Sequence, residues 1–269
     1  NLTSVEFATI DVPDAAGQDL DFDQFVFDIV PAMIAFKIGG DPGAKDQFAV
    51  AVLSRHDSDW DIGYGDADVG PSAAASASAG YGRFRQRVLE YWMGGTWSHR
   101  LGDRLSVGLS PFVGYRAQRN RRSVADGQLS GGAVSSLFVA TENEYNHVRV
   151  LAKAGIAWRP GRFELGATVT APGFKVWSIG KSTFNATVAG VASAPLLSAS
   201  SQRDLPATYE APWSVAGGAT WRTSLTAVHA TVERFSSVDT YDILALEPAP
   251  VAGSSTATPL RRQCAAAGV

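Results

Sequence analysis

The stretch LEYWMGGTWSHRLGDRLSVGLSPFVGYRAQR, residues 89–119, contains two segments of alternating character on either side of a short turn. In the second segment, apolar residues recur at every second position from Leu105 to Val113, and small or polar residues lie between them. Phe112 is the one bulky residue on the small and polar face. A repeat of two residues is the side-chain period of a β-strand. Together with the turn at residues 100–104, the alternation predicts a β-hairpin with one apolar face.

Similar alternation recurs along most of the chain, whereas helical periodicity is scarce. In residues 148–158, for example, Val150 and Ile156 lie on one face and Arg149 and Lys153 on the other. The sequence therefore predicts an all-β fold with about eight antiparallel strands in up-and-down order. The predicted strands are residues 25–38, 47–56, 91–97, 105–116, 148–158, 163–171, 213–221 and 226–235.

The connections between these strands alternate in length. The short connections are residues 100–104, 159–162 and 222–224, and the long ones are residues 57–82, 118–146 and 172–208. We expect the long segments to be irregular loops. Short turns at one end and long loops at the other are typical of transmembrane β-barrels of the bacterial outer membrane. Aromatic residues flank the short turns, where a girdle would meet the membrane interface. These are Trp97, Trp158, Phe163 and Trp221.

The alternation also predicts which side chains face lipid. In a barrel the apolar face points outward, because an outward Lys or Arg near the bilayer midplane costs roughly 2–4 kcal/mol. The predicted outward residues are Val107, Leu109, Val150, Ile156, Leu165, Val169 and Val215. The predicted inward residues are Arg149, Lys153 and Glu164.

Composition excludes several classes of protein. The net charge of -3 leaves no basic footprint for nucleic acid. Cys264 is the only cysteine, so a disulfide-stapled fold is excluded. An aromatic content of 10% argues against disorder. What remains is a transmembrane barrel or a secreted β-sandwich that binds a ligand, since sandwich strands also alternate.

Three blocks of the chain resemble the FadL-type outer-membrane transporters. The first is the hairpin of residues 89–119, whose second strand contains Leu-Ser-Val-Gly-Leu-Ser-Pro at 105–111. The second runs from Val148 through the Arg-Pro turn at 159–160 to Pro172, and the third begins at Leu205-Pro206 and ends at Phe235. Together they cover about residues 85–245.

The resemblance implies passive transport of hydrophobic small molecules such as long-chain fatty acids across the outer membrane. In this family a barrel of about fourteen strands surrounds an N-terminal hatch, and the ligand leaves sideways through a gap in the wall. Here no hatch and no closing strand ending in an aromatic residue are recognisable. We therefore expect residues 1–269 to form one β-barrel domain that is incomplete at both ends. Its strands would lie within residues 22–246, and residues 247–269 would form an irregular tail.

The ligand candidates lie on the predicted lumen face. A basic side chain there could bind a ligand carboxylate, and an apolar one could contact its chain. These candidates are Arg116, Arg149, Lys153, Glu164, Phe112 and Leu151. The alternative is a plain lumen lining, as in a general porin or a structural outer-membrane barrel. We expect a monomeric protein that contacts outer-membrane lipid and binds neither nucleic acid nor a cofactor.

Two further patterns suggest other chemistry. Asp57, Asp59 and Asp61 have the spacing of a calcium loop, but Ile62 occupies the position that requires Gly, so they are weak surface candidates for a cation and we expect no metal. His56 beside Asp57 resembles the strand-end pair of omptin-type barrel proteases. Such a hydrolase needs a second acidic cluster across the barrel mouth. Glu142 and Glu144 are available but match no motif, so a barrel hydrolase is kept only as an alternative and we expect no enzymatic activity.

Overall fold

The structure is a computed structural model in which every regular element of the described residues is a β-strand. Among these residues, no helix is long and apolar enough to cross a membrane. The described residues are 4–13, 19–28, 33–39, 41, 43–69, 76–190 and 196–247.

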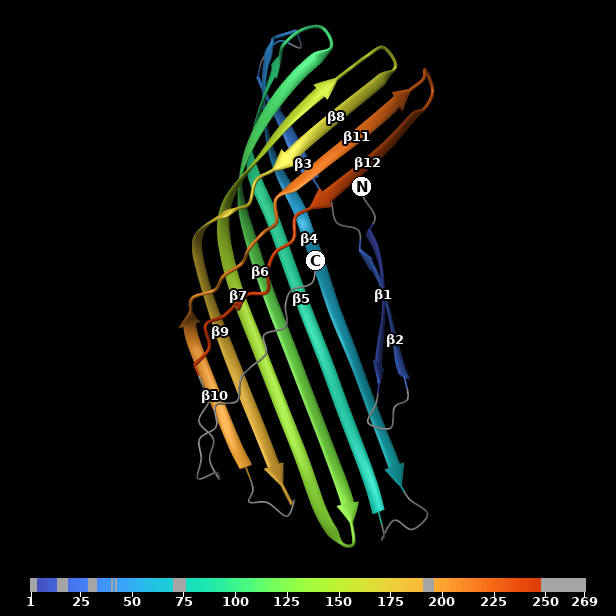
Figure 1. The fold of residues 1–269 in the computed structure, drawn as a ribbon, viewed down its shortest axis with the longest axis vertical. Coiled ribbons are helices and arrows are strands. Elements are labelled where there is room, and N and C mark those ends of the chain that lie inside the picture. Colours follow the sequence, from blue (N-terminus) through green and yellow to red (C-terminus); the bar gives the residue numbers. More distant parts are fainter. Residues whose placement is uncertain are drawn as a thin grey trace.

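Twelve strands are present in the described part of the chain (Figure 1). They are β1 (Ser4–Pro13), β2 (Asp19–Asp28), β3 (Met33–Ile38), β4 (Asp46–Val69), β5 (Ser76–Arg100), β6 (Leu105–Ser130), β7 (Ala133–Trp158), β8 (Phe163–Thr170), β9 (Phe174–Ala189), β10 (Leu196–Leu205), β11 (Ser214–Arg222) and β12 (Ala227–Phe235).

The strands form one curled antiparallel sheet, a half-barrel, with β1 and β2 as a separate hairpin (Figure 1). The main path of hydrogen-bonded neighbours is β12-β11-β8-β7-β6-β5-β4-β3. Each of these eight strands overlaps one of the eight predicted segments, but the predicted strand 25–38 is divided between β2 and β3, and β1, β9 and β10 were not predicted. The prediction of an all-β, antiparallel, up-and-down fold is confirmed. A sandwich of two large packed sheets is not what the described residues form.

The long strand β7 is paired along its length by two shorter strands that lie end to end. Its Lys153–Trp158 segment pairs with β8, and its Ser136–Val150 segment pairs with β9. On their other side, β8 pairs with β11 and β9 pairs with β10. The irregular residues 206–213 separate β10 from β11. Along β7, the β8–β11 pair is thus followed by the β9–β10 pair. The wall of the half-barrel is interrupted between these two pairs of strands.

The prediction that residues 57–82, 118–146 and 172–208 are irregular loops is wrong. Most of residues 57–82 and 118–146 continue the strands, so that β4, β5, β6 and β7 are 24 to 26 residues long. Residues 172–208 contain two further strands, β9 and β10. The connection between β6 and β7 is only Gly131-Gly132, both with positive φ (56° and 80°), as in a tight hairpin turn. The extensions were not predicted because both faces of the strands are polar there, so the sequence shows no alternation of apolar and polar residues. Their ladder is supported by cross-strand ion pairs instead of an apolar face.

The predicted lipid-facing register is largely confirmed. Leu109, Val150, Ile156, Leu165, Val169 and Val215 are each 38–50% exposed on the convex side, and Val107 is half-buried. The aromatic residues beside the short turns are also exposed. Arg149, in contrast, is 3% exposed on the concave side. The apolar band is therefore on the outer wall, as a barrel in a membrane requires.

Two segments cover the concave face, namely residues 206–213 and residues 236–247, which follow β12. Ala207 pairs with Leu244 through an isolated β-bridge, and Thr208 N donates to Ile243 O over 2.8 Å. Tyr145 of β7 is 3% exposed and packs with Ala207, Ile243 and Leu244. Residues 236–246 were expected within the strand region, whereas they form this inner cover. Most of the tail at 247–269 lies outside the described residues.

Candidate ligand-binding site on the concave face

A cavity of about 310 Å³ lies between the concave face of the sheet and the inner cover. Strands β4 to β7 contribute its floor, including Glu90, Arg116 and Arg149. The cover contributes its roof, including Tyr209 and Tyr241. The cavity is thus formed by residues from distant parts of the chain.

The carboxylate of Glu90 is the centre of the polar network in this cavity. Glu90 is 2% exposed. Its Oε1 accepts from Trp92 Nε1 at 2.6 Å and from Arg149 Nη2, and its Oε2 accepts from Arg116 Nη1 at 2.9 Å. One buried carboxylate therefore faces two guanidinium groups.

Strand register and two glycines explain why Glu90 contacts both Arg116 and Arg149. Glu90 on β5 is directly opposite Arg116 on β6. Arg149 is one strand further and is opposite Gly114, whose missing side chain leaves room for the Arg149 stem. A Cβ at Gly114 would lie 3.3 Å from Arg149 Cγ, and one at Gly173 would lie 2.6 Å from Arg149 Cδ. The glycines allow the long side chain to lie flat along the sheet toward Glu90.

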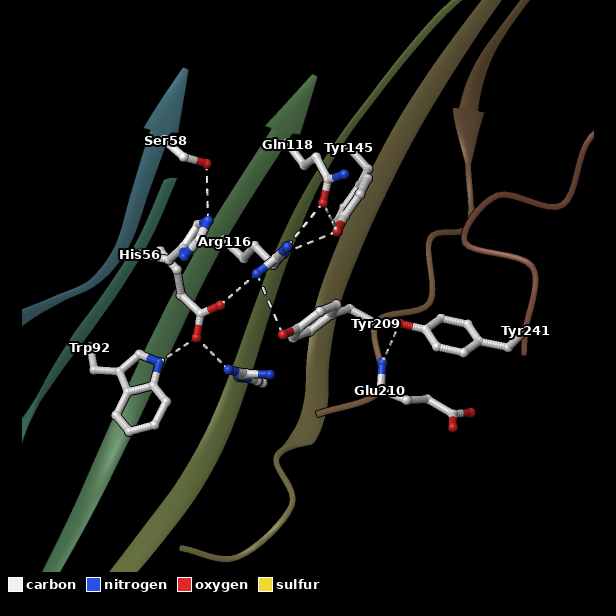
Figure 2. A network of polar contacts seen from close by, with 11 residues as sticks. His56, Ser58, Trp92, Arg116, Gln118, Tyr145, Tyr209, Glu210 and Tyr241 are labelled. Carbon is white, nitrogen blue, oxygen red and sulfur yellow. Dashed lines mark hydrogen bonds and ion pairs between the residues drawn. The ribbon is translucent and has the colours of Figure 1, made fainter. Parts of the chain in front are cut away.

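Arg116 uses its remaining nitrogens on neighbouring side chains. Its Nε donates to Tyr145 Oη at 3.1 Å and its Nη2 donates to Gln118 Oε1 at 3.0 Å. Its guanidinium carbon lies 4.3 Å from the centre of the Tyr209 ring, a cation–π distance. Arg116 is therefore held by partners on several sides (Figure 2).

Arg149 differs because one of its nitrogens is unused. Its Nη1 is buried and has no hydrogen-bond partner among the described residues. The guanidinium lies 4.7 Å from the Tyr209 ring centre and 5.8 Å from that of Trp92. His147, 1% exposed, also has both ring nitrogens without a described partner. Buried polar atoms without a partner are uncommon, and a bound ligand or water would satisfy these ones.

An apolar cluster adjoins the polar network. Trp92, Phe112 and Leu151 are 4–6% exposed and pack together, with Leu53 beside them. A Cβ at Gly94 would lie 2.6 Å from Phe112 Cδ1, so this glycine makes room for the ring. The site therefore places an unused cationic donor next to aromatic and aliphatic surface.

A second group of charges lies at the rim, where Arg55 of β4 reaches Glu233 of β12 over 3.8 Å. Glu233 also accepts from Ser214 Oγ at 2.6 Å. Arg55 and Lys153 lie 5.7 and 5.5 Å from the Trp92 ring centre. Because β4 and β12 are far apart in the sheet order, this ion pair shows how strongly the sheet curls.

The structure brings five of the six predicted ligand candidates together. Arg116 and Arg149 line the cavity. Phe112 and Leu151 form the apolar cluster, and Lys153 lies near Trp92. The exception is Glu164. It accepts from Arg159 and Arg222 beside the short turns, at 3.2 and 3.4 Å, away from the cavity.

Sequence reasoning missed Glu90, Trp92 and the cover residue Tyr209. The signal for the first two was present, because Tyr91, Met93 and Trp97 alternate in the predicted strand 91–97, so Glu90 and Trp92 belong to the opposite, inward face. An isolated carboxylate beside Trp on a lumen face indicates a buried partner. Tyr209 had no comparable signal.

The acidic run is engaged in ion pairs on the outer wall. Asp61 bonds Arg83 at 2.5 Å and Asp59 bonds Arg85 at 3.2 Å. The hydrogen bond from Arg83 holds the pKa of Asp61 below its usual value. In the described part of the chain, no group of three acidic, His or Cys residues has metal-site geometry.

The residues of the hydrolase alternative are not brought together. His56 lines the concave cavity, and its Nε2 lies 3.0 Å from Ser58 Oγ. Glu142 lines a different cavity with Glu144. Burial would raise the pKa of Glu142, but hydrogen bonds from Arg121 and Arg119 lower it below the ordinary value.

Comparisons with protein-family models, with curated proteins and with solved structures found no match for this chain.

Proposed function

We propose that this chain belongs to an outer-membrane barrel that binds hydrophobic small molecules such as long-chain fatty acids and lets them pass passively. The fold is compatible with the outer membrane, because the half-barrel presents its apolar side chains outward. The resemblance of residues 85–245 to FadL-type transporters supplies the ligand class. The observation that carries the proposal is the unused Nη1 of Arg149 beside an apolar cluster.

An amphipathic carboxylate matches this arrangement. Its headgroup would accept from Arg149 Nη1, and a hydrogen bond to a charged group contributes about 1.5–3 kcal/mol. Its chain would contact Trp92, Phe112 and Leu151. A general porin, in contrast, has a polar lumen filled with water. Buried aromatic surface on the concave face favours a hydrophobic ligand over a sugar.

The interruption in the wall supports a sideways exit. Residues 206–213 connect β10 to β11 beside the interruption, belong to no strand and line the cavity. Ser178 Oγ donates to Ala207 O at 2.7 Å, and Lys175 Nζ donates to the same oxygen at 3.4 Å. Movement of this segment would connect the cavity to the lipid through the interruption.

The test uses the full chain in liposomes, with labelled long-chain fatty acid and a small hydrophilic sugar supplied in parallel. We expect fatty acid to bind and cross while the sugar does not. If the sugar crosses and the fatty acid does not bind, the proposal is wrong and the protein is a general porin.

Variants then test the role of Arg149. Arg149→Lys keeps a cation for Glu90 but removes the spare Nη1, so affinity for the fatty acid should fall about tenfold, the equivalent of 1.4 kcal/mol. Arg159→Gln is the matched control, because Arg159 is exposed at a turn. Lys153→Gln, alone and with Arg149→Gln, tests the second cation. Unchanged affinity of the double variant for the fatty acid would show that Arg149 and Lys153 line the lumen without binding the ligand.

A further inference from the structure

Five arginines gather on the outer wall of the far halves of β5 and β6. They are Arg83, Arg85 and Arg87 on β5 and Arg119 and Arg121 on β6, and we call them the arginine patch. All five side chains are exposed. Their positions alternate with residues of the concave face such as Gln118. The patch therefore points away from the ligand cavity.

The register sets these arginines against one another. Arg87 is directly opposite Arg119, and Arg85 is directly opposite Arg121. Neighbouring strands are about 4.8 Å apart, and like charges directly opposite each other destabilise a sheet. These two opposed arginine pairs are neighbours on the same face of the sheet. The protein thus holds four guanidinium groups within a small area at an energetic cost.

Acidic residues reach the patch only from its two sides. On β4, Asp61 and Asp59 bond Arg83 and Arg85. On β7, Glu142 is shared by Arg119 and Arg121, at 2.5 and 2.8 Å, and Glu144 lies 3.8 Å from Arg119 Nε. Arg87, at the centre, forms no ion pair with a described residue.

Four carboxylates therefore pair with four of the five arginines, and the positive charge that has no ion-pair partner among the described residues is that of Arg87. An arginine binds phosphate through two parallel N–H donors, and a cluster of arginines is a recurrent phosphate site. A phosphate bound between the two arginine pairs would relieve the repulsion between the opposed guanidinium groups.

The patch also lies at the level expected for lipid headgroups. Tyr91 and Tyr115 are exposed, opposite each other, and belong to the apolar band. Arg87 and Arg119 are four residues further along the same strands, a distance of about 13 Å. Aromatic side chains mark the edge of the apolar band, and the lipid headgroups lie beyond that edge.

We propose that the arginine patch binds the phosphate groups of anionic lipid headgroups in the surrounding leaflet. The inference rests on the membrane placement within the proposed function, but not on transport. Binding of the phospholipid or glycolipid phosphate in detergent micelles can therefore succeed even if fatty acid uptake fails.

The experiment measures the dissociation constant of the full chain, in nonionic detergent, for three probes. These are lipid A with two phosphates, dephosphorylated lipid A and inorganic pyrophosphate. We expect bisphosphorylated lipid A to bind at least tenfold more tightly than either other probe. Equal binding of dephosphorylated lipid A would overturn the proposal, because phosphate would then contribute nothing. Equal binding of pyrophosphate would also overturn it, because the lipid would then be irrelevant.

Variants assign the binding to the patch. Arg87→Gln/Arg119→Gln should weaken binding of bisphosphorylated lipid A at least tenfold. The matched control is Arg104→Gln/Arg162→Gln, which removes the same charge at exposed residues near the short turns and should change binding less than twofold. Arg87→Gln alone provides a second readout, since it relieves the repulsion with Arg119 without breaking a described ion pair, and it should weaken binding without lowering thermal stability. Equal affinities of the patch and control variants would refute the assignment.

Discussion

Replacing Glu90 by Gln should destabilise the protein far more than any other single carboxylate substitution on the described strands. The side chain keeps its shape and can still accept from the Trp92 indole. What it loses is the negative charge that faces Arg116 and Arg149. The two guanidinium groups would then lie together on the concave face without a carboxylate between them.

The magnitude follows from burial. The side chains of Glu90, Arg149 and Arg116 are 3%, 4% and 11% exposed, so water screens the two arginines poorly. Removing one partner of a buried ion pair costs about 3–5 kcal/mol. That corresponds to a decrease of about two to four decades in the folding equilibrium constant. Arg116 retains bonds to Gln118 and Tyr145, which places the expected loss near the lower limit.

The assay is unfolding of the full chain in urea, in detergent micelles, followed by tryptophan fluorescence. Glu164→Gln is the matched control. Glu164 also bonds two arginines, but these are 62% and 63% exposed beside the short turns. Exposed ion pairs contribute about 0–1 kcal/mol, so the control should unfold almost like the wild type.

A carboxylate ligand should partly rescue the Glu90→Gln variant. A fatty acid bound at Arg149 would restore a negative charge beside the guanidinium groups. At a ligand concentration 100 times the dissociation constant, binding alone stabilises a protein by about 2.7 kcal/mol, and the variant should gain more than the wild type because its cations are unpaired. Equal destabilisation by Glu90→Gln and Glu164→Gln would refute the reasoning, since burial would then make no difference.

Three further outcomes are expected. Gly173→Ala should displace the Arg149 side chain, because the new Cβ would lie 2.6 Å from its Cδ; a fluorescent fatty-acid analogue should bind more weakly, and unchanged binding would contradict this. Gly180→Val should dislodge the inner cover, since a Cβ there would lie 2.3 Å from Leu244 Cδ2; overpacking costs about 1–3 kcal/mol, and limited proteolysis should cleave residues 236–247 faster. Asp61 has a lowered pKa, so its stabilising effect is present above its ordinary pKa and is lost as pH falls through the lowered one. Urea unfolding over a pH series should show this loss below about pH 4, and Asp61→Asn should remove it.

The sequence by itself determined the fold class and the two faces of each strand. A strand repeats every two residues, so the alternation between Leu105 and Val113 assigns each side chain to one face whatever the strand packs against. The same rule placed Arg149 inside and Val150 outside, as observed. The short turns were likewise readable from local sequence.

Pairing beyond the apolar band was not readable from the sequence. In the far halves of β4 to β7, neither face is apolar, so alternation disappears although the ladder continues. Those strands are held together by backbone hydrogen bonds and by cross-strand ion pairs such as Asp61 with Arg83. Register alone decides which charges meet.

The ligand cavity was decided by tertiary structure. Glu90 meets Arg149 across 59 residues of sequence, and it does so because two glycines clear the path of the arginine side chain. Tyr209 and the cover at residues 236–247 reach the cavity only because the sheet curls and encloses a concave face. Alternation specifies the face on which a side chain lies, whereas the partner it meets there depends on the curvature and register of the whole sheet.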